Sequence, residues 1–385
     1  MQAYLDNSAT TRAFDSVAGL VAQVMTQEYG NPSSVHHMGV VAEKRVNEAR
    51  EIIAATLKAD PSEIFFTSGG TESDNLAIIG AARANAFRGR HIITTEIEHP
   101  AVRGCFEYLK GEGYEVTYLP VDDRGVVSIS DLKEALRKDT VLVSMMMVNN
   151  EIGSIEPVSE AGKLIKSVDP GIVFHVDAVQ AYGKLRIRPA SLGIDLLSVS
   201  SHKIHGPKGV GFLYIKKGTR IQPVCFGGGQ QKGMRSGTEN VPGIAGMAMA
   251  AQICHEDLDE KMKRLYELKR YLGESLSERI SGIRLNGPSC DEGAPHILSV
   301  SISGLAAETV LNMLSAKQIY VSAGSACTSN NPHVSDTLKA IGVPKELLES
   351  TIRISMSVET TREEIDYLIE TLSSSVEAMR KFYRH

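Results

Sequence analysis

The chain has 385 residues, of which 42% are hydrophobic, so it is long enough for two domains with well-filled cores, and its composition argues against extended disorder. Its net charge of -5 and pI near 6.2 give no whole-chain attraction to nucleic acid or to an anionic membrane surface. The first residues, "MQAYLDNSATT", contain no basic segment followed by an apolar stretch, and no apolar run is long enough to span a membrane, so we expect a cytoplasmic protein.

Apolar strand-like runs alternate with helical patterns over most of the chain, which is typical of parallel βαβ units. The predicted strands are residues 64–67, 91–95, 115–119, 141–148, 172–176, 195–200 and 211–215. Because these runs are almost continuously apolar, we expect helices to cover both faces of the sheet.

The pattern changes after residue 255. Leucines at helical spacing predict a long helix, which is followed by a strand, "ILSVSIS", and by a C-terminal helix with an apolar stripe. We therefore predict an α/β fold with two domains. A large domain, residues 15–255, has a mainly parallel central sheet, and residues 1–14 and 256–385 form a smaller α+β domain.

Ligands of open α/β sheets bind beyond the carboxyl ends of the strands, and a glycine motif follows the first predicted strand. After "IFFT" comes "SGGTESDN" and then a helical pattern. Two glycines and a hydroxyl at a helix N-terminus can hold a phosphate group, although an ordinary turn capped by Thr71 explains the string equally well. The spacing matches neither of the two common nucleotide-binding glycine motifs.

A carboxylate and a lysine follow two later strands: Asp177 comes directly after the run 172–176, and Lys203 follows the run 195–200. Burying either charge is costly without a partner, and a mutual salt bridge is the simplest explanation. Together with a phosphate cradle, however, the pair also suits pyridoxal phosphate, whose aldehyde reacts with a lysine and whose ring nitrogen is held protonated by a carboxylate. An opposite charge in contact shifts a pKa by about 1–3 units, which is enough to hold that proton.

The five cysteines are odd in number and far apart in the sequence, with no C-x-x-C pair, so we expect neither a disulfide framework nor a metal site. Cys327 differs from the other four because it stands in "SAGSACTSNN", a run of small polar residues with nothing apolar to bury it. We expect such a thiol to be accessible and not packed in a core.

Several segments, taken together and in order, resemble the cysteine desulfurase family of the NifS/IscS type. They are "YLDNSATT", "GNPSSVH", "TSGGTESDNLA", "EHPAV", "VNNEIG", "HVDAVQ", "SSHKIHGPKG", "GMRSGTEN", "SAGSACTS" and "TIRIS". The resemblance covers residue 4 to about residue 375. It implies a homodimer with the fold of type I pyridoxal-phosphate enzymes, which converts L-cysteine to L-alanine and holds the sulfur as a cysteine persulfide.

The resemblance also implies roles for single residues around the cofactor ring. Lys203 would be the Schiff-base lysine, Asp177 the partner of the ring nitrogen and Gln180 the donor to the phenolic oxygen. His99, in "EHPAV", would stack on the ring and assist proton transfer. Without the resemblance, a histidine at a strand end has no assigned role.

The remaining implied contacts are to phosphate and substrate. The phosphate would be held by Gly70, Thr71, Ser200 and His202 and by Thr238 of the partner subunit. Asn150 would contact cofactor and substrate, and Arg353 would bind the substrate carboxylate through its planar fork. The alternative for Arg353 is a solvated charge, but its neighbours Ile352 and Ile354 predict a half-buried strand.

Cys327 would be the nucleophile that takes the sulfur. To collect sulfur at the cofactor and deliver it elsewhere, a loop at about residues 322–335 would have to move, and its small, polar composition suits that role.

The sulfur acceptor is left open by the sequence. Met147 precedes "VNNEIG" where the housekeeping branch of the family usually has histidine, and the chain ends at "RKFYRH", before the tail that this branch uses to dock its iron–sulfur scaffold. An iron–sulfur scaffold, a tRNA-thiolation enzyme or a dedicated pathway all remain candidates.

Two other classes of function are weighed against the desulfurase. A selenocysteine lyase or an aminotransferase of the same fold would share Lys203 and Asp177, but an aminotransferase gives no reason for "SAGSACTS". A non-catalytic scaffold would not need the complete set of cofactor residues.

Overall fold

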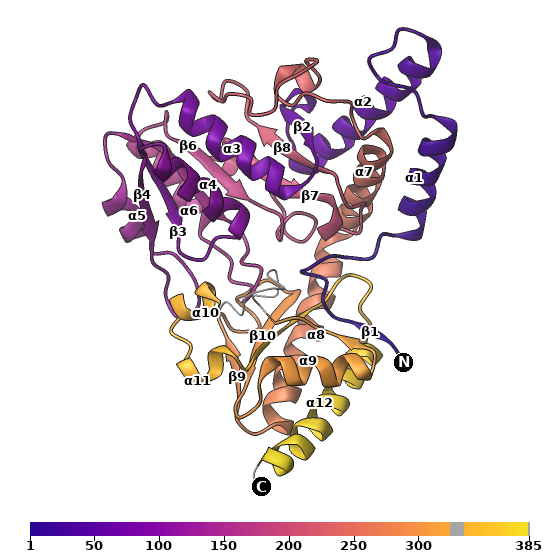
Figure 1. Cartoon of the computed structure of the whole chain (residues 1–385), viewed down its shortest axis with the longest axis vertical. Helices are drawn as coiled ribbons and strands as arrows, with labels where there is room; N and C mark the ends of the chain where they lie inside the picture. Colours follow the sequence, from indigo (N-terminus) through magenta and orange to yellow (C-terminus); the bar gives the residue numbers. More distant parts are fainter. Residues whose placement is uncertain (324–334, 384–385) are drawn as a thin grey trace.

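A seven-stranded sheet is the centre of the larger part of the molecule in the computed structural model, which describes residues 1–323 and 335–383, with side chains as far as Arg380 (Figure 1). The strand order is β2-β8-β7-β6-β5-β3-β4. The strands are β2 (Ile64–Thr67), β3 (His91–Thr95), β4 (Glu115–Leu119), β5 (Thr140–Met146), β6 (Val173–Asp177), β7 (Leu196–Ser200) and β8 (Gly211–Ile215). Only β8 runs antiparallel to its neighbours in this sheet, so the sheet is mainly parallel, as predicted.

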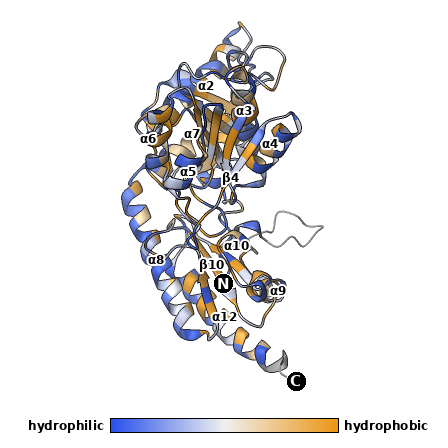
Figure 2. Ribbon diagram, turned by 90° about the vertical axis from the view of Figure 1, so that its left-hand side faces the viewer, coloured by the Kyte–Doolittle hydropathy of each residue, from blue (hydrophilic) through white to orange (hydrophobic). Residues whose placement is uncertain are grey.

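Helices cover both faces of this sheet, which is why the strands are apolar on both sides (Figure 2). One face is packed by α1 (Asp15–Gln27), α2 (His37–Leu57), α5 (Ile129–Ala135), α6 (Val158–Val168) and α7 (Val241–His255), and the other by α3 (Gly70–Ala84) and α4 (Pro100–Gly111). The connections that enter α3 and α4 leave the carboxyl ends of β2 and β3, so both helices begin at the edge where ligands of such sheets bind.

A second layer of sheet and helix forms the lower part of the molecule in Figure 1. Its elements are β1 (Ala3–Tyr4), α8 (Leu258–Arg279), β9 (Ile283–Asn286), β10 (Ile297–Ile302), α9 (Ala307–Ala316), β11 (Ile319–Tyr320), α10 (Asp336–Ala340), α11 (Lys345–Leu348), β12 (Thr351–Ser355) and α12 (Arg362–Tyr383). The apolar stripes of α8 and α12, predicted from leucine and isoleucine spacing, pack together in one separate core cluster with β10 and β12.

The N-terminal segment belongs to this second core. β1 pairs in parallel with β11, and Ala3 and Leu5 are fully buried among residues from α8 onward. We therefore propose the division expected from the sequence, a large domain at 15–255 and a small one from 1–14 and 256–385, and these separate cores support it.

All seven predicted strands are present in the structure, and their limits agree with the predicted ones to within two residues. Residues 64–67, 91–95, 115–119 and 211–215 form strands with those limits. The prediction of 141–148 runs two residues too far, because after Met146 the chain turns out of the sheet and Val148 pairs with Ile155 in an isolated bridge. The prediction of 172–176 ends one residue too early, so Asp177 is the last residue of its strand.

Among the described residues, no helix combines the length and the apolar character needed to cross a bilayer.

Candidate active site

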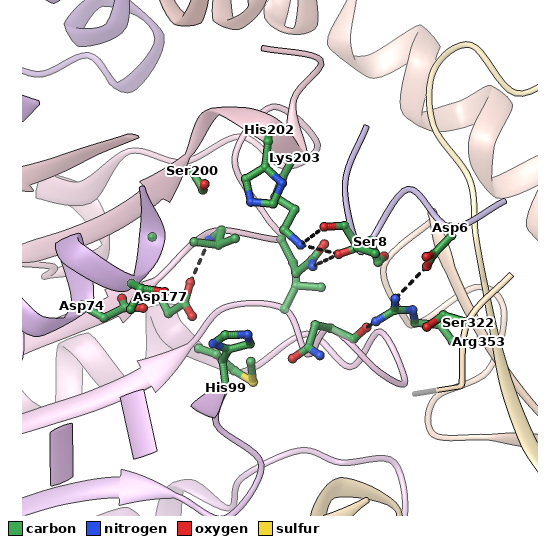
Figure 3. Close-up of a pocket in the computed structure, with 18 residues that line it drawn as sticks. Asp6, Ser8, Asp74, His99, Asp177, Ser200, His202, Lys203, Ser322 and Arg353 are labelled. Atoms are coloured by element: carbon green, nitrogen blue, oxygen red, sulfur yellow. Dashed lines mark hydrogen bonds and ion pairs between the residues drawn. The ribbon is translucent and has the colours of Figure 1, made fainter. Parts of the chain in front are cut away.

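A cavity of about 360 Å³ opens at the carboxyl edge of the large sheet, where it meets the N-terminal segment and β12 (Figure 3). This volume is typical of a site for a small organic cofactor. The cavity is lined by Asp6, Ser8, Ala9, Gly70, Thr71, Asp74, His99, Met146, Val148, Asn150, Asp177, Val179, Gln180, Ser200, His202, Lys203, Ser322 and Arg353. Ten of the residues for which the sequence predicted a role within the chain therefore meet in one place.

The glycine motif forms a tight cradle at the start of α3. Gly69 has a φ of 151°, which favours glycine, and a Cβ on Gly70 would lie 2.7 Å from Val179 Cγ2. This close packing brings the first turn of α3 to the cavity wall, beside Ser200 and His202, which also line it. Free amides at a helix N-terminus together with hydroxyl and imidazole donors are a suitable set for a phosphate group.

Asp177 ends β6 at the floor of the cavity and is 5% exposed. Its Oδ1 accepts a hydrogen bond of 2.9 Å from the backbone amide of Val179. Burial raises the pKa of Asp177, while the nearby His99, that amide and Lys203 oppose the rise. A cation placed against the carboxylate would hold it ionised, and the protonated ring nitrogen of pyridoxal phosphate is such a cation.

Lys203 lies in the 3-10 turn Ser201–Lys203 that follows β7. Its Nζ donates hydrogen bonds to the main-chain oxygens of Ser8 and Ala9, the second at 2.8 Å. Gln180 Nε2 also donates to Ser8 O, at 3.0 Å, and the buried Gln180 Oε1 has no hydrogen-bond partner in the described part of the chain. The N-terminal segment thus contacts Lys203 and Gln180, two of the four side chains for which a role at the cofactor ring was predicted.

His99 is the N-cap of α4, and its Nδ1 accepts a 3.1 Å hydrogen bond from the backbone amide of Ala101. Because Nδ1 is an acceptor, the neutral ring carries its proton on Nε2. Burial lowers the pKa of His99, with Lys203 acting in the same direction and Asp177 against it. The ring is therefore kept neutral, in the state that can give or take a proton at Nε2.

His202 is held close to the phosphate cradle. Its Nδ1 lies 3.2 Å from Thr10 Oγ1, and burial, with smaller contributions from nearby lysines, lowers its pKa to about 4. It is a neutral hydrogen-bonding group at physiological pH.

Arg353 reaches the cavity from β12 and is 5% exposed, so it is more buried than the half-buried strand position that the sequence predicted. Its Nη1 donates to Asn150 O and its Nη2 to Asp6 Oδ1, both at 2.9 Å, whereas Nε has no partner among the described residues. A buried guanidinium with unused donors at a cavity wall is suited to bind a carboxylate.

Two assigned residues are not part of this cavity as described. Thr238 is exposed and lines a separate cleft with Ser68 and Arg235. Cys327 lies outside the described residues, as does most of the loop at 322–335. The chain leading to that loop is fixed up to Ser322, whose backbone exchanges two hydrogen bonds with Arg353, of 2.6 and 3.1 Å.

Further residues line the cavity although no role was predicted for them. Asp6, Ser8 and Ala9 stand in "YLDNSATT" and Asp74 stands in "TSGGTESDNLA". Their signal was their place in family segments, because neither an isolated loop nor a helix interior shows by its pattern that it borders a cavity.

The other four cysteines are buried or half-buried: Cys105 and Cys254 are buried, and Cys225 and Cys290 are half-buried. Cys105 in α4 and Cys254 in α7 are buried in helices, and burial raises the pKa of their thiols to about 12 and about 11. Cys290 is half-buried, because it packs against the core of the smaller part of the molecule.

Comparison with known proteins gives matches over nearly the whole chain. The profile of the aminotransferase class-V family matches residues 3–368. The chain is 45% identical to the cysteine desulfurase IscS of Dictyoglomus turgidum, over 98% of this chain and 95% of that protein. It is 42% identical to a cysteine desulfurase of Nostoc sp., over 98% and 93% of the two chains. Among solved structures, a NifS-like protein superposes with a TM-score of 0.92 at 41% identity, over 98% of this chain and 100% of that one.

Proposed function

The chain belongs to the aminotransferase class-V family and is a pyridoxal-phosphate-dependent cysteine desulfurase, and from this premise we propose how its own residues act on L-cysteine. The observation that carries the proposal is the single cavity in which Lys203, Asp177 and Arg353 meet. An amine, a buried carboxylate and a carboxylate receptor on three walls are the groups that a pyridoxal-phosphate enzyme acting on an amino acid needs.

The residues present suit the cofactor. Gly70, Thr71, Ser200 and His202 would hold its phosphate, Asp177 its ring nitrogen and Gln180 its phenolic oxygen, through the second N–H of the Nε2 group. Bound there, pyridoxal phosphate supplies an electron-withdrawing ring that stabilises negative charge at the substrate carbon atoms. Asp74 Oδ1 and Gln180 Oε1 are buried polar atoms that accept no hydrogen bond from the described residues, and a polar cofactor beside them would reduce the free-energy cost of their burial.

Proton transfer is assigned to Lys203 and His99. The Nζ of Lys203 would take the Cα proton of the substrate, and His99 would carry a proton at Nε2, the nitrogen that its cap to Ala101 leaves available. Asn150 would contact both cofactor and substrate, while Arg353 would fix the carboxylate and so set which substrate bond faces Lys203.

Cys327 would receive the sulfur. Its thiolate attacks the substrate sulfur, an S–S bond forms as the C–S bond breaks, and the electron pair of that bond stays on the substrate carbon, which gains a proton. The products are a persulfide on Cys327 and L-alanine. The two sulfur atoms together lose two electrons, and the substrate carbon gains them.

The assembly, acceptor and compartment are also proposals. A homodimer would bring Thr238 of the partner subunit to the phosphate, and its exposure here, away from the cavity of its own chain, supports that arrangement. The persulfide would pass to an iron–sulfur scaffold or a tRNA-thiolation enzyme in the cytoplasm. The name IscS carried by the relative in Dictyoglomus turgidum favours the first of these acceptors.

The test is to supply L-cysteine to the purified holoenzyme, measure alanine and sulfide, and locate the persulfide by mass spectrometry. We expect persulfide at Cys327, and a loss of more than 100-fold in alanine formation for Cys327→Ser, with Cys290→Ser as the matched control. Full alanine formation by Cys327→Ser, or a persulfide found only on another cysteine, would contradict the assignment. Intact transamination in that variant would instead favour an aminotransferase.

A further inference from the structure

Arg353, the proposed receptor for the substrate carboxylate, already has a carboxylate from its own chain against it. Asp6 Oδ1 accepts from Arg353 Nη2 at 2.9 Å, and both side chains line the cavity (Figure 3). The Arg353 side chain is 6% exposed and that of Asp6 is 21% exposed, so the pair is screened by little water. The two charges therefore balance one another strongly before any ligand enters.

The backbone of Asp6 is held firmly, whereas its carboxylate forms a single hydrogen bond among the described residues. Asp6 forms a parallel bridge with Ser355, two residues beyond Arg353 on the same strand, and the amides of Asn7 and Ser8 donate to Ser355. The carboxylate has no hydrogen bond other than the one to Arg353 among the described residues. It is therefore anchored beside the arginine and can still rotate away from it.

We propose that Asp6 is an affinity-determining residue that competes with the carboxylates of substrate and product for Arg353. An α-carboxylate that enters the cavity brings a second negative charge to the same guanidinium, and it either displaces Asp6 from Nη2 or binds beside it against like-charge repulsion. When L-alanine has formed, Asp6 regains Arg353 and product release is favoured. This inference rests on the proposed function of Arg353.

The substitution Asp6→Asn removes the negative charge of the side chain and keeps its shape. In Asp6→Asn the amide oxygen can still accept from Arg353 Nη2, so the guanidinium keeps its orientation, while the competing charge is gone. The probes are L-alanine and L-alaninamide, in which a neutral amide replaces the carboxylate, and the readout is the absorbance change of the bound cofactor as each is titrated into the holoenzyme.

We expect Asp6→Asn to lower the Kd of L-alanine roughly tenfold, which corresponds to about 1.4 kcal/mol, and to change the Kd of L-alaninamide less than twofold. The KM for L-cysteine should fall and inhibition by L-alanine should rise. Asp6→Ala, the second variant, should change the ratio of the two Kd values in the same direction. The matched control is Asp15→Asn, which removes an exposed carboxylate that pairs with Arg12 and does not line the cavity, and it should change neither Kd.

An unchanged or raised Kd of L-alanine in both variants would overturn the inference, because Asp6 would then orient Arg353 or play no part. Equal shifts for both probes would overturn it too, since they report a general change of the cavity. Arg353→Gln separates this failure from that of the proposed function. If this variant does not selectively weaken L-alanine, then the role of Arg353 itself is wrong. If it does and Asp6→Asn has no effect, only the present inference fails.

Discussion

Glu98, the residue before His99, should make the stability of the protein strongly dependent on pH. It is 6% exposed, and its Oε1 accepts from the Met146 amide at 2.9 Å and from Thr95 Oγ1 at 2.8 Å. Its Oε2 has no hydrogen-bond partner within residues 1–323 and 335–383. Burial, with a smaller contribution from the negative charges of Asp177 and Glu156, raises its pKa from 4.5 to about 8. The folded chain therefore holds this proton more tightly than the unfolded chain does.

Proton binding by Glu98 determines the sign and the size of this pH dependence of stability. A raised pKa in the folded state gives stability that is fully present below 4.5 and is lost as the pH rises through about 8. Each unit of pH within that window costs up to about 1.4 kcal/mol, so from about pH 5 to about pH 8 the loss from Glu98 is about 3 kcal/mol. Glu98→Gln cannot lose a proton, and its amide oxygen keeps both hydrogen bonds of Oε1.

The assay is urea unfolding of wild type and Glu98→Gln at several values of pH, compared as the difference between the two. We expect the free energy of unfolding of the variant, relative to that of wild type, to increase steadily as the pH rises. The new buried amide nitrogen adds a constant difference, which is the same at every pH and does not affect this trend. Glu278→Gln, at an exposed position of α8, is the matched control. A difference between Glu98→Gln and wild type that stays constant over this range would refute the reasoning.

The other predictions concern the cradle, the histidine and the thiols. Gly70→Ala should weaken cofactor binding about tenfold, measured by equilibrium titration of the apoprotein, because its Cβ would lie 2.7 Å from Val179 Cγ2; Gly104→Ala, which meets nothing within 4 Å, is the control. His99→Ala should lower the free energy of unfolding by about 1 kcal/mol through loss of the α4 cap, and His99→Asn, which can cap, should restore stability without restoring turnover. Iodoacetamide at about pH 8 should leave Cys105 and Cys254 unmodified in the folded protein and modify them after denaturation, since burial raises the pKa of both thiols.

The strands were predictable from the sequence where the local pattern decides them. "IFFT" and "HIITT" have short apolar runs with clear ends, and the structure forms strands with those limits. The antiparallel direction of β8 was not predictable, because it depends on where the chain goes after Lys203, and no residue within the strand records that. Strand order is likewise a property of the whole sheet.

Some features of the site could likewise be predicted from the sequence, and others could not. The proximity of Asp177 and Lys203 could be predicted from the sequence. Asp177 ends β6 and Lys203 follows β7, and the carboxyl ends of such parallel strands lie at the same edge of the sheet. The contact of Asp6 with Arg353 joins residues 347 positions apart and needs the N-terminal segment to lie against β12, which no local pattern reveals. The burial of Glu98 depends on β5, so its adjacency to His99 in "EHPAV" gave no sign of a raised pKa.

One edge of β12 connects substrate binding to the segment that leads to Cys327. β10 occupies the other edge, while on this edge Asp6 bridges to Ser355 and Ser322 bridges to Arg353 itself. Ser322 begins the loop at 322–335 and is followed by one more described residue, Ala323. Its backbone hydrogen bonds to Arg353 fix it to the residue proposed to hold the substrate carboxylate. A shift of Arg353 on binding a carboxylate would therefore move Ser322 as well. Exchange of the Arg353 and Ser322 amides with solvent deuterium should slow when L-alanine is bound, and equal exchange with and without L-alanine would show that the two are not coupled.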